Sequence, residues 1–313
     1  LELMRHRFEK PRTDSDTLQK LVDVTIGSRR DAKQNPDAIH DALGHWTRRG
    51  RQSPILTEMS NEKMRKLNLQ DLLDAISALP LYERRLGYIG NRPPGELAKL
   101  LETGRPFKRA PARRPVKLVS PAKPRVMFTH RDMVQTRVGL SLPDDAFDAA
   151  ASVDYNFFAS YLGGGMSSLI FQEIREARSL AYSAWGGYAP AEHKRDDNEA
   201  YGGLECQADK TVEAAVLLGD LVLTPPLTAE RFAQTAAAIE QSYRTNPIQF
   251  RQIPSVLMTW EDQGLPPGDP RPERFARVQR YTLKDLERFS ARFKGRAASL
   301  YLLGHRDRMG LDQ

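Results

Sequence analysis

Apolar residues recur at helical spacing through the first hundred residues of the chain. The pattern predicts one helix that begins near Asp14, a second that begins at Pro36, and two more that cover 69–79 and 93–101. A short apolar run at 86–89 is typical of a strand. This part of the chain is therefore predicted to be mostly helical.

The pattern changes after residue 124, where strands and helices alternate. Thr282 and Asp285 form a capping-box sequence at the start of one expected helix. The expected order is two strands joined by a short polar turn, two helices, two antiparallel strands, three helices and a last strand. These elements are predicted at 125–129, 135–142, 147–161, 169–178, 180–189, 199–208, 210–223, 229–243, 283–293 and 298–303. The fold class is therefore predicted to be α+β, with helices covering one face of an antiparallel sheet.

A basic, proline-rich segment, Arg105–Pro124, separates these two parts. It contains seven cations, five prolines and no acidic residue. Prolines at this density prevent helix formation and remove the hydrogen-bond donors that a sheet needs. We therefore expect an exposed, extended linker over 105–124, with one domain over 1–104 and another over 125–313.

This linker also explains the charge of the whole chain. The 313 residues carry 47 Lys and Arg against 40 Asp and Glu, a formal net charge of +7, and the seven cations of the linker account for that excess. A nucleic-acid-binding face needs cations clustered on a folded surface, so this class of function is disfavoured. The 40% apolar content is ordinary for a globular protein, and no apolar run approaches the ~20 residues of a membrane span.

The cysteine and the histidines argue against a metal site in this chain. Cys206 is the only cysteine, so no disulfide can form within the chain. A zinc site on one helix needs two histidines on one face beside a carboxylate, as in H-x-x-E-H, and no pair of histidines has that spacing. His40 and His45 are five residues apart and would diverge around a helix. We therefore predict no metal site.

Three consecutive glycines, Gly163, Gly164 and Gly165, precede an expected helix. Their free backbone N–H groups could hold an anion, but the sequence fits neither a Walker A loop nor the G-x-G-x-x-G pattern. A tight turn that lets two helices pack closely is the plainer interpretation. A third interpretation is that a peptide backbone passes the glycines, where no side chain blocks its approach.

The segment that follows contains a candidate catalytic group. Phe171 and Arg175 lie on one face of the expected helix, and Tyr182 lies on a strand that can turn back beside it. A guanidinium and a phenol are donors that need no deprotonation, which suits holding a carbonyl oxygen that gains negative charge. In the structural alternative, Arg175 pairs with Glu173 or Glu176 and the Tyr182 hydroxyl lies in water. Composition alone favours that alternative.

The stretch Tyr161–Ser183 resembles a known family signature. Its residues YLGGGMSSLIFQEIR, followed by LAYS at 180–183, fit the pattern LGG…SSxLFxExRExxxLAYS of the second-domain signature of the pitrilysin/insulinase zinc peptidases. The likeness to the fourth domain of a four-domain protein covers about 125–313, and a weaker likeness to the end of the third domain covers about 1–104. Further similar segments are Gln135, Gln207–Thr211 and Leu302–Asp307.

The resemblance implies repeated α+β domains that form two bowl-shaped halves around a chamber. In that family, zinc lies in the first domain on an H-x-x-E-H helix, and the other half supplies an Arg and a Tyr that hold the substrate carbonyl. These two correspond to Arg175 and Tyr182, with Phe171 and the three glycines as further substrate-binding residues. Because this chain lacks H-x-x-E-H, zinc is expected in a missing N-terminal half or a partner chain. The chain alone is expected to be inactive.

The residues and the resemblance leave three hypotheses. In the first, this chain is the substrate-binding half of a zinc endopeptidase that cleaves peptides. In the second, it is a non-catalytic relative, like the core subunits of the respiratory cytochrome bc1 complex, although the presence of both Arg175 and Tyr182 favours the first. The third, a nucleic-acid binder, rests only on Arg105–Pro124. No signal segment follows Leu1, but a chain that does not begin with Met leaves the compartment open. The resemblance suggests the bacterial periplasm or cytoplasm.

Overall fold

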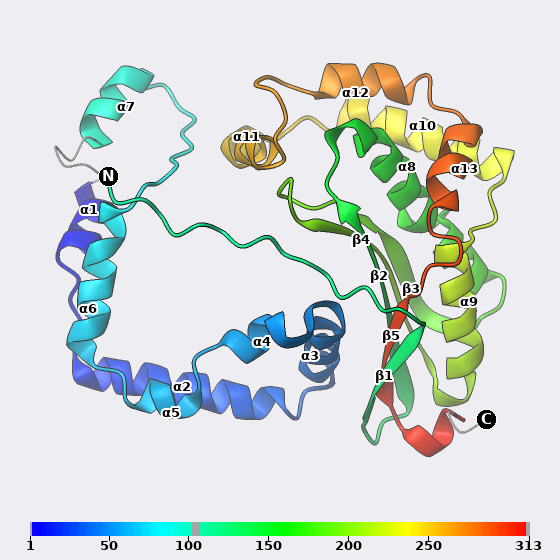
Figure 1. Cartoon of the computed structure of the whole chain (residues 1–313), viewed down its shortest axis with the longest axis horizontal. Coiled ribbons are helices and arrows are strands. Elements are labelled where there is room, and N and C mark those ends of the chain that lie inside the picture. The colour runs from blue at the N-terminus through cyan, green and yellow to red at the C-terminus, as the bar shows by residue number, and fades with distance from the viewer. Residues whose placement is uncertain (1, 102–106, 311–313) are drawn as a thin grey trace. The chain divides into compact units, whose positions relative to one another are not determined.

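The computed structural model describes residues 2–101 and 107–310 (Figure 1). Within the chain, two compact units can be distinguished. Unit 1 comprises Leu1–Asn35, Thr57–Arg114 and Phe250–Ser255, and unit 2 comprises Pro36–Leu56, Pro115–Gln249 and Val256–Gln313. Helix α3 (Pro36–Arg49) belongs to unit 2 although it precedes the basic segment in the sequence.

Unit 1 is built from helices. Helix α2 (Ser15–Ala32) begins where the sequence predicts, because the Asp14 carboxylate accepts a hydrogen bond from the Thr17 N–H at 2.7 Å. The strand predicted at 86–89 is wrong. These residues have irregular backbone, since the described part of unit 1 contains no strand with which they could pair. The other helices of unit 1 are α1 (Glu2–Glu9), α5 (Asn61–Arg65), α6 (Leu69–Ala78) and α7 (Pro94–Leu101).

The described part of unit 1 has almost no interior. Val22 and Met64 are its only buried hydrophobic side chains among the described residues. A helix that leaves its apolar stripe exposed lacks the layer against which it would pack. Large apolar side chains that are exposed on these helices include Leu3, Leu21, Val24, Ile76 and Leu100.

Unit 2 is built around a five-stranded sheet with the strand order β1-β5-β2-β4-β3 (Figure 1). The expected antiparallel pairing of the third and fourth strands is present, and it runs from Ala181 opposite Cys206 to Ala189 opposite Glu199. The strands are β1 (Arg125–His130), β2 (Gln135–Ala146), β3 (Ala181–Ala189), β4 (Asp197–Gln207) and β5 (Ser299–Gly304). Together with the helices below, this sheet confirms the predicted α+β class.

The two strands joined by the predicted short turn, β1 and β2, do not pair with each other. The last strand, β5, lies between them and pairs in parallel with β1, with Arg125 opposite Ser299. It pairs antiparallel with β2. Leu302 and Leu303 of β5 are 3% and 0% exposed, so this apolar strand is buried inside the sheet rather than left at an edge. The sheet is thus antiparallel except for one pair.

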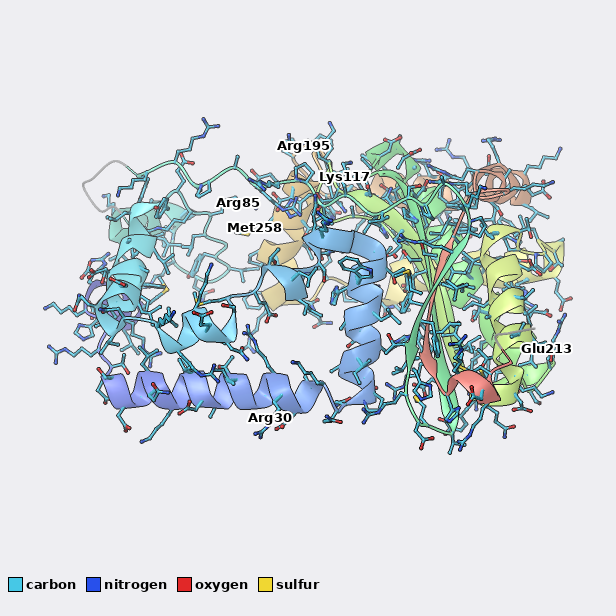
Figure 2. The ribbon with its side chains drawn as sticks, turned by 60° about the horizontal axis from the view of Figure 1, so that its bottom comes forward. Arg30, Arg85, Lys117, Arg195, Glu213 and Met258 are labelled. Atoms are coloured by element: carbon cyan, nitrogen blue, oxygen red, sulfur yellow. The ribbon has the colours of Figure 1, made fainter. Side chains whose placement is uncertain are left out.

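One face of the sheet forms the core of unit 2. Val138, Leu140 and Leu142 of β2 alternate along this face and are at most 1% exposed. The helices on this side are α8 (Ser152–Gly163), α9 (Thr211–Leu223), α10 (Ala229–Thr245) and α13 (Leu283–Ala291). Glu213 projects from the side of α9 that faces away from the sheet (Figure 2). Two short helices that the sequence did not predict, α11 (Ile253–Asp262) and α12 (Arg271–Val278), complete this region.

Helix α3 covers part of the opposite face. Its Gly44 and Gly139 of β2 both lie against the ring of Tyr301, and a Cβ atom added at either glycine would lie within 3.0 Å of that ring. The Arg125 guanidinium also donates to the Thr47 carbonyl of α3 at 2.6 Å. Helices therefore contact both faces of the sheet, whereas the sequence predicted only one covered face.

The described part of the basic segment, 107–124, has no helix or strand, apart from an isolated bridge at Lys108. Its beginning at Arg105 lies outside the described residues. The segment is not free along its whole length, because the Lys117 ammonium pairs with the Asp197 carboxylate at 2.6 Å. Lys117 is labelled in Figure 2. Within the described residues, we find no helix with the length and apolar character that crossing a membrane requires.

Candidate functional site

A cavity of about 520 Å³ lies where β3 begins and β4 ends. Both Arg175 and Tyr182, the pair singled out from the sequence, line it. Neither Phe171 nor any of the three glycines is among the described residues that line it. The complete lining is Gln135, Arg175, Glu176, Ser179, Leu180, Ala181, Tyr182, Glu205, Cys206, Gln207 and Lys210.

Arg175 is carried by a π-helix rather than by the expected α-helix. Only Leu169 and Ile170 are α-helical, and Phe171–Glu176 forms a π-helical turn that closes with a hydrogen bond from the Ala177 N–H to the Gln172 carbonyl at 2.8 Å. Such wide turns are often found at functional sites. The turn was not predicted, because nothing in the residue pattern separates it from an α-helix.

The Arg175 guanidinium is held on two sides. Its Cζ lies 4.8 Å from the centre of the Phe171 ring, a cation–π contact, and its Nε lies 3.5 Å from the Glu176 carboxylate. The side chain is still 45% exposed. The ion pair expected in the structural alternative is thus present, yet the guanidinium keeps donors that face the cavity and solvent.

Tyr182 is displaced from the regular pleat of β3. The ladder with β4 shifts register between Ala181 and Ser183, so Tyr182 sits in a bulge, a device that re-aims a side chain. Just before it, Ser179 has a φ of 51°, the one left-handed residue other than glycine among the described residues. Tyr182 is 78% exposed. The bulge therefore turns this phenol out of the regular pleat, and the phenol lines the same cavity as Arg175.

The other groups around the cavity are polar but poorly suited to act as nucleophiles. Burial raises the pKa of the Cys206 thiol to about 11, so the thiol is neutral and unreactive near neutral pH. Glu205 is paired with Arg137, with 3.1 Å between Nε and Oε1. Lys210 adds a second cation to the lining. The cavity can therefore donate hydrogen bonds to an oxygen that gains negative charge, but it offers no activated base or nucleophile.

The three glycines lie outside the lining of this cavity and differ in their surroundings. A Cβ atom at Gly163 would lie 1.6 Å from the Gly186 carbonyl oxygen of β3, so this glycine lets the end of α8 pack directly on the strand. Gly165 has a φ of 117° and open space around it. The packing interpretation of Gly163 fits, except that the helix packs on a strand rather than on a second helix. Gly164 lines a separate cavity of about 240 Å³ beside Ser168.

No metal-binding cluster is found in the part of the chain that the structure describes: no three His, Cys, Asp or Glu side chains gather there. His130 and His305 come together, with ring centres 5.0 Å apart. The Asp132 carboxylate lies 4.0 Å from the His305 Nε2, and this side chain is 80% exposed. The residues present therefore do not fit zinc.

Solved structures with the same fold are known. A peptidase M16 inactive domain from Pseudomonas fluorescens is similar over 97% of this chain and 74% of that chain, with a TM-score of 0.76 and 17% identity. A protease from Helicobacter pylori is similar over 97% and 75%, with a TM-score of 0.72 and 14% identity. The periplasmic protease PqqL from Escherichia coli has a TM-score of 0.71 and 14% identity, and only 34% of that longer chain is covered.

Sequence comparisons point in the same direction. A family model described as the peptidase M16 inactive domain matches residues 73–236, which is more than half of the chain. Uncharacterized zinc proteases from Mycobacterium tuberculosis and Mycobacterium bovis are 39% identical over 62 residues. That segment is 20% of this chain and only 14% of those relatives.

Proposed function

Because this chain belongs to the family of peptidase M16 inactive domains, we propose that it is the substrate-binding half of a zinc-dependent endopeptidase. In this proposal the zinc lies in an N-terminal half or a partner chain, since the residues described here hold no site for it. When bound in that other half, zinc supplies a polarised carbonyl and an activated water. This chain supplies the surface that holds the peptide.

One observation carries the proposal: the Arg175 guanidinium and the Tyr182 phenol line one cavity and are both exposed. Both groups donate hydrogen bonds without losing a proton. They can therefore hold the oxygen of a peptide carbonyl and stabilise it as it gains negative charge. The stacking of Phe171 against Arg175 limits the rotamers of the arginine side chain. Arg175 therefore loses less conformational entropy when a substrate binds.

The state of unit 1 supports a missing neighbour. Its described helices bury only Val22 and Met64 among their hydrophobic side chains. In an α+β domain such helices cover a sheet, and unit 1 contains no strand among its described residues. We propose that unit 1 is the helical layer of a half-domain whose sheet comes from a preceding segment, and that the zinc-bearing half lies beyond it.

The proposal is tested by restoring an H-x-x-E-H half and measuring zinc and peptide cleavage. This chain alone should carry no stoichiometric zinc and cleave no peptide, and the zinc-bearing half alone should cleave poorly. The two together should cleave an unstructured peptide at a much higher rate. Tight zinc binding by this chain alone would contradict the assignment. If the two halves assemble but no peptide is cleaved, the chain is a non-catalytic relative that retains the fold for assembly.

A further inference from the structure

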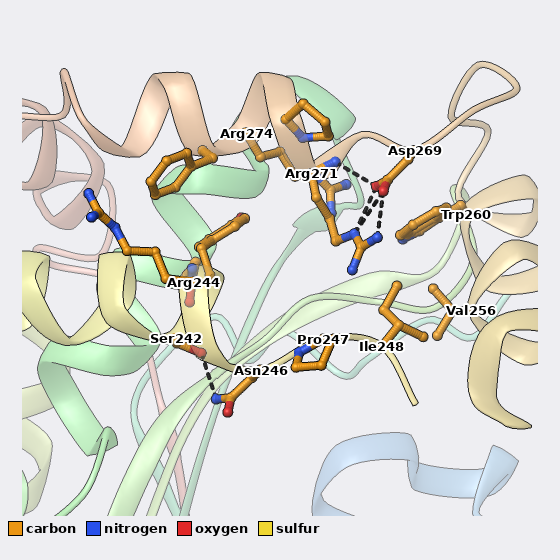
Figure 3. Close-up of a pocket in the computed structure, with 14 residues that line it drawn as sticks. Ser242, Arg244, Asn246, Pro247, Ile248, Val256, Trp260, Asp269, Arg271 and Arg274 are labelled. Carbon is orange, nitrogen blue, oxygen red and sulfur yellow. Dashed lines mark hydrogen bonds and ion pairs between the residues drawn. The ribbon is translucent and has the colours of Figure 1, made fainter. Parts of the chain in front are cut away.

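A second cavity, of about 660 Å³, shares no lining residue with the cavity of Arg175 and Tyr182. It is formed by the end of α10, the loop that follows it, α11 and α12 (Figure 3). The loop 190–197 contacts this region, because the Lys194 N–H donates to the Asp262 carbonyl of α11 at 3.0 Å. This loop leads into β4 at Asp197, which pairs with Ala146 at one end of the β2–β4 ladder, and Gln135 lies at the other end. The volume of the cavity is that of a small-molecule site.

The charges around this cavity do not balance. Three guanidinium groups, those of Arg244, Arg271 and Arg274, line it together with a single carboxylate, that of Asp269. Asp269 is fully used by Arg271: its oxygens accept from the Arg271 side chain at 2.5 to 3.0 Å and from the Arg271 backbone N–H at 3.0 Å. Figure 3 shows these contacts as dashed lines. No second carboxylate belongs to the lining among the described residues.

Arg274 is the cation of the lining that forms no close ion pair, although the charges of Asp269 and Glu273 act on it from a greater distance. Its guanidinium donates to the Ser152 hydroxyl at 3.2 Å, and no carboxylate of the described residues lies within 4.0 Å of it. Burial lowers the pKa of Arg274, which reflects the cost of removing this charge from water. Arg244, by contrast, pairs with Glu240 at 3.4 Å and stacks over Phe275. A partly desolvated guanidinium that faces a cavity favours an anionic ligand.

The rest of the lining is apolar. Ile248, Val256 and Trp260 contribute to it, and Figure 3 shows their side chains beside the Asp269–Arg271 pair. Such walls suit an aliphatic or aromatic group. One unpaired guanidinium matches a single negative charge, and its planar donors match the two oxygens of a carboxylate.

We propose that this cavity binds a monocarboxylate that bears an apolar group, with the carboxylate on Arg274 and the apolar group against Ile248, Val256 and Trp260. Two sources share this chemistry: a small free carboxylic acid and the carboxyl terminus of a peptide with an apolar last residue. The site does not depend on the proposed peptidase role, because it requires neither zinc nor a second half.

The test is a calorimetric titration of the purified chain with N-acetyl-L-phenylalanine. Its amide, which has the same shape without the charge, is the matched control ligand. A short peptide that ends in Phe with a free carboxylate distinguishes the two sources. If the peptide binds at least as tightly as the small acid, the site takes peptide termini. If only the small acid binds, the site takes a free acid. Either result supports the site.

Three variants make the test specific. Arg274→Gln should weaken binding of the acid by at least about tenfold, as expected for losing a charged hydrogen bond. Arg277→Gln is the control, because Arg277 lies on the same helix but donates to the Ala150 carbonyl and does not line the cavity. Arg277→Gln should bind the acid with the same affinity as wild type. Ile248→Asp, in a partly exposed loop, should abolish binding by repelling the anion even if Arg274→Gln fails to fold.

The proposal is overturned by any of three results. One is that neither free-acid probe binds saturably up to about 10 mM, a concentration that covers weak millimolar affinities. Another is that the amide binds as tightly as the acid, which would show that no charge is recognised. The third is that Ile248→Asp, or a folded Arg274→Gln, binds the acid as tightly as wild type.

Discussion

Substitution of Gly163 by alanine tests how the glycines are used in unit 2. The added Cβ would lie 1.6 Å from the Gly186 carbonyl oxygen and 2.6 Å from its carbon. Real Cβ atoms do not approach other heavy atoms within 3.0 Å. The obstacle is backbone inside a paired strand, not a flexible side chain. The end of α8 must therefore move away from β3 by about 1.4 Å or more, the difference between those two distances.

The expected loss of stability in Gly163→Ala follows from the residues that move with the end of α8. Tyr161 and Leu162 directly precede the glycine and are both 0% exposed, so a shift opens the core on one side and strains it on the other. Overpacking of this kind costs about 1–3 kcal/mol, occasionally more. Gly219 is the matched control, because it lies inside α9 with no atom within 4 Å of its added Cβ. Gly219→Ala should stabilise by about 0.5–1 kcal/mol.

The assay is urea unfolding of the two variants beside wild type, followed by circular dichroism. Gly163→Ala should lower the midpoint concentration and Gly219→Ala should raise it, with unchanged slopes. The opposite signs separate close packing from a general effect of alanine on helices. If Gly163→Ala unfolds at the same urea concentration as wild type or at a higher one, the packing role assigned to Gly163 is refuted.

Three further outcomes are expected. Limited trypsin should cut after the exposed Arg109 before it cuts after Lys117, whose ammonium pairs with Asp197; peptide mapping that finds the reverse order would contradict the anchoring of this segment. Cys206 should react with iodoacetamide far more slowly in the folded chain than in urea, because burial raises the pKa of its thiol to about 11. Equal alkylation rates in the folded and unfolded chain would contradict this protection of the thiol. The pKa of the thiol is about 8.5 in the unfolded chain and is raised to about 11 in the folded chain. The buried neutral thiol therefore contributes to the free energy of unfolding, and this contribution should be lost as pH rises from about 8.5 towards 11.

Local chemistry made several elements predictable from sequence. The Asp14 cap and the Thr282–Asp285 capping box each place the start of a helix within a few residues, and both are present. The antiparallel pairing of β3 with β4 was predictable for the same reason, since the two strands are close in the sequence. The α+β class follows from the order of such elements.

Long-range pairing and irregular backbone were not predictable. Paired residues of β1 and β5, such as Arg125 and Ser299, are 174 residues apart in the sequence. No local pattern indicates that β5 lies between β1 and β2. The run at 86–89 looks like a strand by composition, but a strand needs a partner. The π-helical turn under Arg175 and the bulge at Tyr182 depend on tertiary packing, which residue periodicity does not record.

The two sites differ in how far the sequence indicated them. Arg175 and Tyr182 were singled out by their donors and by a family resemblance, and the structure brings both to one cavity. Glu205 and Lys210 in the same lining were not assigned a role, because the place of Glu205 depends on the β2–β4 register and Lys210 lies in a 3-10 turn after β4. Arg274 carries no motif at all. Only the count of charges around a folded cavity makes it visible.

The measurement that tests the central claim most directly compares Arg175→Ala with Arg178→Ala in the complete enzyme, with the zinc-bearing half restored. Arg178 is exposed, three residues on, and does not line the cavity. If Arg175 holds the substrate carbonyl in the transition state, Arg175→Ala should lower kcat and kcat/KM together, by ~10²–10³ in kcat, or about 2.7–4 kcal/mol. Arg178→Ala should keep wild-type turnover. If Arg175→Ala keeps wild-type kcat/KM with fold and zinc content intact, the proposed role of this half in catalysis is contradicted.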